Sequence, residues 1–353
     1  MLSRSAEMET STVSPAVEMV GLHKHYLASN RFWQRRRPFA ALTGVDLRVE
    51  AGEIFGLVGR NGYGKTTLIR CVAGLIMPSA GQVRVYGKDT VRDDLEVRRL
   101  IGWVGAEERS FYLRLTARQN LLFFARLQGL ADAVALARMD AFAERFQCAD
   151  LLERRVHELS TGNRQRFSII RALIHAPRLL ILDEPTRSLD PFAADDLRKI
   201  LRDWVSEDAR RSILITSHHL HEIEAMSDRI AIMGKGRLGA VGTFEELRTK
   251  LGGGQRVEIA FQPSVGEPEL TALCQAEPRL QWRSNQGGSL LFFRREAGDE
   301  FFDHVLRQCQ KRGFRIEQVT TNEISLQEMI DRLAESSDTA SMPSQGSELH
   351  VAV

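Results

Sequence analysis

The stretch GRNGYGKTT at residues 59–67 places three glycines, one lysine and two threonines in nine positions. It follows an apolar run at 54–58, which predicts a buried strand, and precedes a helical pattern at 66–73. Glycines let backbone N–H groups close around oxygen atoms without a Cβ in the way, and the N-terminus of the following helix favours negative charge. A glycine-rich loop in this context holds phosphate groups. We therefore expect Lys65 to reach the β- and γ-phosphates of a nucleotide and the Thr66 hydroxyl to face Mg²⁺.

A second apolar run, LLIL at 179–182, ends in Asp183 and Glu184. In an open parallel sheet, the carboxyl end of this strand would lie beside the phosphate loop. A buried strand that ends in two carboxylates is energetically costly unless a cation lies nearby. We expect Asp183 to bind Mg²⁺ and Glu184 to polarise the attacking water as a general base.

The rest of the pattern indicates an α/β fold that contains a helical insert. Apolar runs at 212–216 and 229–233 predict two more buried strands, and helical patterns lie between the strands. Residues 106–172 contain few strand-like patterns and carry helical stripes, one of which includes Phe123 and Phe124. We expect both phenylalanines to lie in the core of the insert.

A glycine run at 252–254 marks a boundary between two domains, at 17–250 and 251–335. The second is predicted to be a small α+β domain, with strands at 256–261, 289–293 and 314–319 and helices at 269–276 and 299–312. The two ends of the chain, residues 1–16 and 336–353, are polar and rich in serine, so we expect them to be disordered.

Composition narrows the class of protein. Hydrophobic residues make up 43% and charged residues 27% of the 353 positions, as in an ordinary globular protein. A net charge of +2 gives no support for a nucleic-acid partner, and no apolar run approaches the roughly 18 residues that span a bilayer. The four cysteines lie far apart, which favours reduced thiols over disulfides or a zinc site. Work at a membrane would therefore require a partner that spans it.

Three further segments identify a family. Residues 159–166 read LSTGNRQR and resemble the signature sequence of ABC-type ATPases, usually LSGGQ. The segment ILDEPTRSLDP at 181–191 resembles the family's Walker B strand, catalytic glutamate and D-loop, and residues 216–218 resemble its switch-histidine element. Kinases and GTPases share the phosphate loop but lack the other elements. The resemblance covers residues 17–245 and implies an α/β P-loop NTPase core of ABC type with an antiparallel β-subdomain and a helical subdomain.

The resemblance also implies a mechanism in which two copies pair head to tail and enclose two ATP molecules. The signature of one copy would contact the γ-phosphate bound by the other, while His218 and Glu184 would position the attacking water. The residues implied to contact ATP are Tyr26 at the adenine, the phosphate-loop residues Gly59, Arg60, Asn61, Gly62, Tyr63, Gly64, Lys65, Thr66 and Thr67, the signature residues Ser160, Thr161, Gly162 and Asn163, and Asp190 of the D-loop. An ordinary strand-end tyrosine is the alternative for Tyr26.

The chain departs from the family pattern at several positions. The Q-loop glutamine, which would contact Mg²⁺, is replaced by another residue. Counting forward from the apolar run at 101–104 places Ala106 at this position, whereas counting back from residues 115–116 places Glu107 there, and we favour Glu107.

Residues 218–221 read HHLH, which could suggest a metal site. We favour one switch histidine and two surface histidines, because the usual i, i+4 spacing is absent.

The main hypothesis is an ATPase subunit of an ABC exporter, a homodimer that docks on a separate transmembrane permease near Phe111 and Tyr112. The chain would then lie at the cytoplasmic face of the membrane without crossing it. Residues 322–330 resemble the C-terminal extension of exporter-type subunits, which suggests dimer support or regulation. One alternative is a soluble ABC ATPase that acts on ribosomes or nucleic acid, but the paired ATPase domains, coiled coils or zinc inserts usual in that class are absent. Another alternative is a nucleotide-dependent regulator with little turnover, supported only by the altered Q-loop.

Overall fold

The computed structural model describes residues 14–28, 37–106, 110–187, 189–217, 220–250, 255–262, 265–285, 288–295 and 300–323. The chain divides into two compact units, the first running to Phe244 and the second spanning Glu245–Ser336. The predictions of disorder at 1–13 and 336–353 lie outside the described residues. Ala16, predicted to belong to the disordered end, is fully buried, and its carbonyl accepts a hydrogen bond from Tyr86 N–H at 3.2 Å. The ordered chain therefore begins before residue 17.

A six-stranded sheet forms the centre of the first unit, in the order β10-β9-β3-β8-β7-β6. Its strands are β3 (Ile54–Val58), β6 (Ile101–Val104), β7 (Leu179–Asp183), β8 (Ser212–Thr216), β9 (Arg229–Gly234) and β10 (Arg237–Gly242). Neighbouring strands are parallel, except that β10 is antiparallel to β9. Every residue of β3, β7 and β8 is buried, as expected for continuous apolar runs covered on both faces. The strands predicted at 54–58, 179–182, 212–216 and 229–233 are confirmed as β3, β7, β8 and β9.

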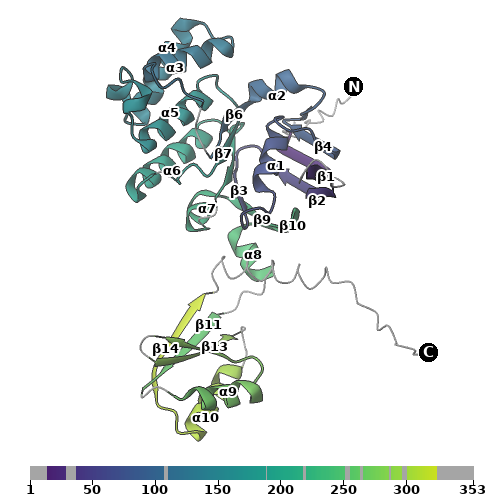
Figure 1. Cartoon of the computed structure of the whole chain (residues 1–353), viewed down its shortest axis with the longest axis vertical. Coiled ribbons are helices and arrows are strands. Elements are labelled where there is room, and N and C mark those ends of the chain that lie inside the picture. Colours follow the sequence, from purple (N-terminus) through teal and green to yellow (C-terminus); the bar gives the residue numbers. More distant parts are fainter. Residues whose placement is uncertain are drawn as a thin grey trace, which may run out of the picture. The chain divides into compact units, whose positions relative to one another are not determined.

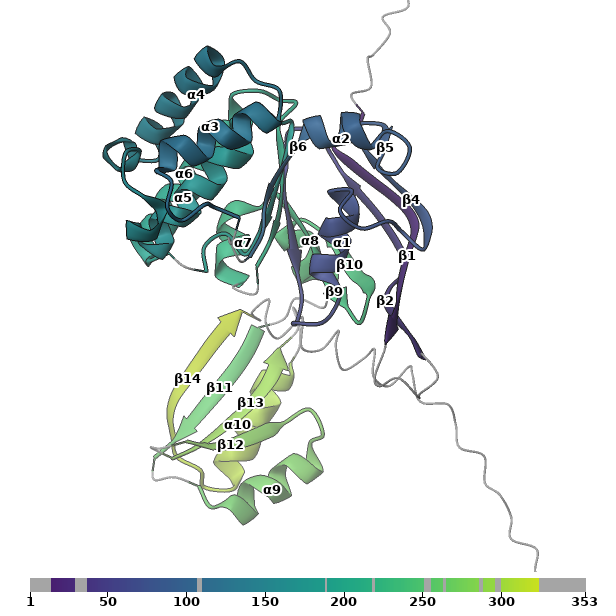
Figure 2. The same cartoon turned by 45° about the horizontal axis from the view of Figure 1, so that its top comes forward.

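A second, antiparallel sheet has the order β2-β1-β4-β5. Its strands are β1 (Val17–Ala28), β2 (Arg37–Val49), β4 (Ala80–Val85) and β5 (Lys88–Asp89). Helix α1 (Lys65–Val72) lies between this sheet and the central sheet (Figure 2), and its buried apolar side chains belong to the apolar core that joins them. The short helix α2 (Asp94–Leu100) precedes β6. The phosphate loop is therefore anchored at both ends by buried elements.

Further helices lie on the face of the central sheet opposite to α1 and extend beyond the sheet (Figures 1 and 2). They are α3 (Ala117–Leu127), α4 (Asp132–Arg145), α5 (Thr161–Leu173), α6 (Pro191–Ser206) and α7 (Leu220–Met226), with short 3₁₀ turns at Ala149–Leu151 and Val156–Glu158. The prediction that Phe123 lies in the core of the insert is wrong, because its side chain is 37% exposed. Leu121 and Ala125, four residues apart, define the buried stripe of α3, and Phe123 lies about 200° around the helix from each.

The second unit is a split βαβ arrangement. Its elements are β11 (Gln255–Phe261), α9 (Glu267–Ala276), β12 (Gln281–Asn285), β13 (Gly288–Arg295), α10 (Phe301–Lys311) and β14 (Ile316–Glu323), and α8 (Phe244–Lys250) precedes them. The antiparallel order β12-β13-β11-β14 is that of a ferredoxin-like sheet. Val257, Ile259 and Phe261 alternate along β11 toward a core shared with α9 and α10. The predicted strands and helices of this unit are present, and β12 is an additional strand.

Candidate nucleotide-binding site

The predicted phosphate loop connects the carboxyl end of β3 to α1, in the strand–loop–helix context that the sequence indicates. Gly64, which caps α1, has φ of 97°, a conformation that side chains other than glycine rarely adopt. A Cβ at Gly64 would lie 2.6 Å from the Ala41 carbonyl oxygen, so main chain from β2 closes against the loop. The N–H of Gly236, from the turn between β9 and β10, donates to the Tyr63 carbonyl at 3.1 Å. The loop is therefore held by backbone from two sides, and only glycine fits at position 64.

Lys65 folds back over this loop. Its side chain is buried, and Nζ donates to the carbonyl oxygens of Gly59 at 2.5 Å and Arg60 at 3.3 Å. Burial lowers the pKa of Lys65, while the charges of Glu184 and Asp183 act in the opposite direction. The carboxylates at the end of β7 are thus electrostatic neighbours of the lysine, which places the two predicted motifs at one site.

Asp183 lies at the point where three elements meet. Its carboxylate is 5% exposed, and Oδ1 accepts a hydrogen bond of 2.6 Å from Thr216 Oγ1. Oδ2 accepts a longer hydrogen bond of 3.4 Å from Thr66 Oγ1 at the start of α1. Carboxylate and hydroxyl oxygens are ligands that Mg²⁺ prefers, so this donor set fits the ion. Thr216 was expected only as part of the switch-histidine element, and its contact with Asp183 could not be predicted because it depends on the register of β7 against β8.

Glu184 follows the end of β7 in an unusual backbone conformation, with φ of 51°. Such a conformation costs a non-glycine residue about 1–3 kcal/mol and is concentrated at functional sites. Its N–H donates to the Thr216 carbonyl at 2.9 Å, which fixes the turn. Its carboxylate is mostly buried, and Arg187 Nη1 lies 3.8 Å from Oε2. The backbone of the residue predicted to be the general base is therefore fixed at the end of β7, and its carboxylate is close enough to act on the charge of Lys65.

The signature segment forms the start of α5. This helix belongs to the helical region, which comprises helices α3 to α6. Ser160 is the N-cap of this helix, and its Oγ accepts a hydrogen bond from Asn163 N–H at 3.2 Å. Thr161, Gly162 and Asn163 form the first helical turn, and Ser160 and Thr161 are exposed. A helix N-terminus presents backbone N–H groups and favours an anion. The arrangement is open to a ligand carried by another molecule.

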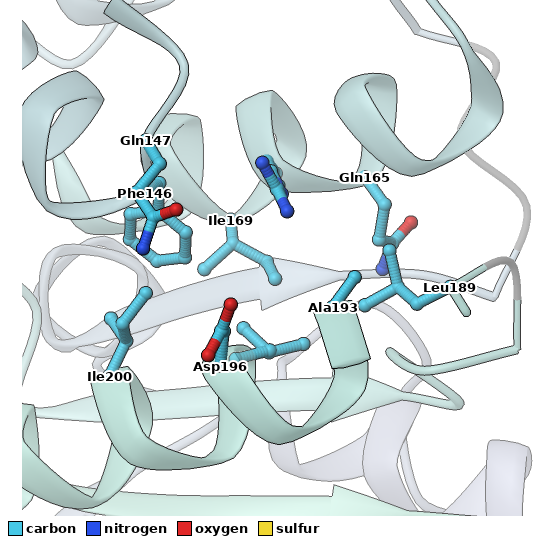
Figure 3. Close-up of a pocket in the computed structure, with 10 residues that line it drawn as sticks. Phe146, Gln147, Gln165, Ile169, Leu189, Ala193, Asp196 and Ile200 are labelled. Carbon is cyan, nitrogen blue, oxygen red and sulfur yellow. The ribbon is translucent and has the colours of Figure 1, made fainter. Parts of the chain in front are cut away.

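Asp190 caps α6 in a similar way, since its carboxylate accepts from Ala193 N–H at 3.0 Å. A small cavity of about 10 Å³, the space of roughly one water molecule, lies between α5 and α6 (Figure 3). Gln165 of the signature helix and Leu189, which precedes Asp190, lie next to each other at one end of this cavity. The signature helix and the D-loop are therefore packed close together in one copy of the chain.

Other predicted site residues lie apart from this cluster or outside the described residues. Tyr26 in β1 is 37% exposed, with Lys24 Nζ 5.2 Å from the centre of its ring, and its role as an adenine contact stays a prediction. Glu107, His218 and His219 lie outside the described residues, as does the D-loop residue Ser188.

A groove of about 270 Å³ lies between the central sheet and the helical region. Its walls include the apolar side chains of Leu75, Trp103, Phe124 and Leu127, and the cationic Arg98 and Arg171. The Arg171 guanidinium lies over the rings of Phe111 at 5.0 Å and Phe124 at 4.8 Å. Of the two aromatic residues predicted at a docking surface, Tyr112 is 52% exposed, whereas Phe111 is buried.

Two kinds of feature were not found in the parts of the chain that the structure covers. Across the described ranges, no helix combines the length and the apolar character needed to cross a membrane. Within the same ranges, no three His, Cys, Asp or Glu side chains gather in a group that could hold a metal ion.

Comparison with known proteins identifies the family. Residues 42–187 match the family described as ABC transporter. The chain is 37% identical over 219 residues to the ABC transporter ATP-binding protein NatA of Bacillus subtilis, covering 62% of this chain and 88% of the relative. It is 35% identical over 289 residues to the daunorubicin resistance ATP-binding protein DrrA3 of Streptomyces coeruleorubidus, covering 82% of this chain and 89% of that protein. These relatives give no support to the alternative of a soluble ATPase that acts on ribosomes or nucleic acid.

Solved structures agree with the sequence comparison. The structure described as an ATP binding subunit of an ABC transporter matches with a TM-score of 0.58 and 27% identity, and the match covers 67% of this chain and 93% of the other. A bacterial Atm1-family ABC exporter with ATP bound matches with a TM-score of 0.56 and 26% identity, over 67% of this chain and 40% of the exporter. The predicted P-loop NTPase fold of ABC type is confirmed.

Proposed function

The chain belongs to the ABC transporter ATP-binding proteins and is an ATP-hydrolysing subunit of that family, and from this premise we propose how its residues divide the work. Lys65 and the backbone of residues 59–67 hold the triphosphate. Thr66 and Asp183 hold Mg²⁺, which offsets the negative charge of the phosphates when it is bound. Glu184 is the general base that accepts a proton from the attacking water. The observation that carries this assignment is the convergence of Thr66, Thr216 and Glu184 on the end of β7.

We infer a head-to-tail homodimer that completes each site. The signature turn at Ser160 is exposed and offers helix N–H groups to an anion, which is the complement of a nucleotide held by a second copy. Asp190 would lie close to the same interface, because Leu189 packs beside Gln165 of the signature helix. His218, Glu107 and Tyr26 keep their predicted roles at the γ-phosphate, at Mg²⁺ and at adenine, and these roles rest on the family resemblance alone.

The second partner we propose is a transmembrane permease that docks in the groove between the central sheet and the helical region. The rim of this groove exposes large apolar side chains, with Leu75 59% and Leu127 68% exposed. Tyr112 does not line the groove, but its ring lies 5.1 Å from that of Phe123, which is next to the groove residue Phe124. Contiguous exposed apolar side chains beside a groove favour a protein partner. Through this contact the chain would be held at the cytoplasmic face of the membrane. Export is the proposed direction, because DrrA3 is named for resistance to daunorubicin.

The domain limits also remain our proposal: an ATPase domain at 17–250, with a helical subdomain at 106–172, and an accessory domain at 251–335. The ferredoxin-like unit has its own apolar core, built from Val257, Leu270 and Val305 among others. A unit with its own core can be removed without unfolding the ATPase domain, which suits a regulatory or dimer-supporting role.

The proposed chemistry is tested with the Glu184→Gln variant of the full chain. We expect ATP binding to persist, because the phosphate loop is unchanged, and steady-state hydrolysis to fall at least about a hundredfold, because general-base catalysis contributes on that scale. Glu207→Gln, at an exposed position beyond α6, is the matched control and should hydrolyse ATP like the original chain. Unchanged turnover in Glu184→Gln would remove Glu184 from the role of general base.

A further inference from the structure

We propose that Glu222 is a positioning residue for ATP hydrolysis, which joins the loop after the general base to the loop that carries the switch histidine. This inference rests on the proposed function and extends it to a residue that does not belong to the phosphate-binding, signature or carboxylate motifs. Glu222 lies in the first turn of α7. Its Oε2 accepts a hydrogen bond of 3.1 Å from Ser217 Oγ and a short hydrogen bond from Thr186 Oγ1.

The two donors belong to two different loops at the carboxyl edge of the central sheet. Thr186 follows β7, two residues after Glu184, and its side chain is 4% exposed. Ser217 follows β8, directly precedes His218 in the sequence, and is 2% exposed. A carboxylate oxygen has lone pairs for two donors, so a single atom of Glu222 can link both loops. The turn that follows Glu184 and the residue that precedes His218 in the sequence are therefore connected through one side chain.

The helix that carries this carboxylate has little freedom to move. Ile223, the next residue, is fully buried against β3, where a Cβ on Gly56 would lie 2.5 Å from Ile223 Cγ2. At the other end of α7, Arg202 Nη2 of α6 donates to the Met226 carbonyl at 2.5 Å. Close packing against the strand that leads into the phosphate loop means that Glu222 is positioned relative to that loop. We infer that α7, packed against the central sheet, holds the loops after β7 and β8 in place through Glu222.

Loss of the carboxylate should affect catalysis more than nucleotide binding. The two hydroxyls are buried, so removing their shared acceptor leaves them without this partner and releases the turn that follows Glu184. A displacement of about 1 Å in a catalytic group can cost up to about a hundredfold in rate. The phosphate loop and Asp183 have their own hydrogen bonds, which do not involve Glu222. The expected signature is a fall in kcat with an unchanged KM for ATP.

The test compares variants of Glu222 in the full chain by steady-state kinetics, ATP binding and thermal unfolding. Glu222→Ala should lower kcat by about tenfold or more while KM and the Kd for ATP stay within twofold. Glu222→Gln should recover most of the rate, because its amide oxygen can accept from both hydroxyls. Glu224→Ala, an exposed carboxylate of the same helix, is the control and should leave kcat unchanged.

Two further variants keep the test decisive if Glu222→Ala is poorly folded. Thr186→Val and Ser217→Ala each remove one donor, and combining them should lower kcat about as much as Glu222→Ala does, without a further loss when all three changes are combined. A kcat within twofold of the original in Glu222→Ala, or in the Thr186→Val, Ser217→Ala double variant, would overturn the proposal. If instead the proposed function is wrong and Glu184 is not the general base, the Glu184→Gln variant would hydrolyse ATP at the original rate. This result is independent of the rates measured for the Glu222 variants.

Discussion

Thr216 donates a 2.6 Å hydrogen bond to the Asp183 carboxylate across the parallel pair β7 and β8, and its backbone carbonyl accepts from Glu184 N–H. One residue at the end of β8 therefore holds both the carboxylate of Asp183 and the backbone of Glu184. Since Asp183 is buried, this hydrogen bond also compensates part of the cost of removing a charge from water.

The first prediction concerns this hydrogen bond. Thr216→Val keeps the shape of the side chain but removes the donor, so Asp183 loses a partner and its orientation toward Thr66. We expect the free energy of unfolding to fall by about 1–3 kcal/mol. More Mg²⁺ should be needed for half-maximal ATP hydrolysis. Urea unfolding and a Mg²⁺ titration of turnover measure the two effects.

Thr249→Val is a suitable control, because the Thr249 hydroxyl donates only locally, to the Glu245 carbonyl within α8. It should leave both the unfolding midpoint and the Mg²⁺ requirement of hydrolysis unchanged. An unchanged Mg²⁺ requirement in Thr216→Val would argue against a role of Asp183 orientation in metal binding.

The second prediction concerns the backbone of the phosphate loop. Gly64→Ala would place a Cβ 2.6 Å from the Ala41 carbonyl oxygen at a φ of 97°. The loop must move to relieve that contact, so we expect ATP affinity, measured by isothermal titration calorimetry, to fall by at least about tenfold. Gly234→Ala has no atom within 4 Å of its new Cβ and should bind ATP normally. Equal affinities in the two variants would contradict the description of the loop.

The third prediction separates permease docking from hydrolysis. Leu127→Asp puts a charge on the rim of the groove, at a side chain that is 68% exposed. Because an exposed position tolerates a charge, the isolated chain should hydrolyse ATP at its original rate. Copurification of the permease from detergent-solubilised membranes should fall several-fold. Val20→Asp, which is 56% exposed on β1 away from the groove, should copurify normally, and equal recovery with both variants would place the permease elsewhere.

The fourth prediction uses the cysteines to probe packing in the two units. Burial raises the pKa of Cys148 to about 12 and that of Cys71 and Cys309 to about 11. A raised thiol pKa leaves less thiolate at a given pH, and these three side chains are also shielded from reagents. Cys274 is half-buried, so iodoacetamide at pH 8 should modify it first, as read by mass spectrometry. Early modification of Cys148 would indicate that the helical region opens in solution.

The sequence was informative wherever a local pattern determined the structure. The apolar run at 54–58, the glycines that follow it and the run that ends in Asp183 predicted both the strands and the edge of the sheet where they meet. Helix periodicity was ambiguous for Phe123, because both sides of α3 carry large apolar residues and only packing decides which side is buried.

Contacts between distant residues could not be predicted in the same way. The hydrogen bond from Thr216 to Asp183 depends on the register of two strands, and the links from Glu222 to Thr186 and Ser217 depend on where α7 packs against β3. The conformation of Glu184 with positive φ has no sequence signal either, because it arises from the turn that its hydrogen bond to Thr216 closes.

The shared site is tested most directly by mixing two inactive variants. Glu184→Gln lacks the general base but keeps its signature, whereas Ser160→Arg blocks the signature but keeps its general base. If each ATP is held between two copies, a mixed dimer contains one intact site, and the mixture should hydrolyse ATP faster than either variant alone, up to about a quarter of the original rate for random pairing with independent sites. A mixture no faster than its two components, in a preparation shown by crosslinking to contain mixed dimers, would contradict the account.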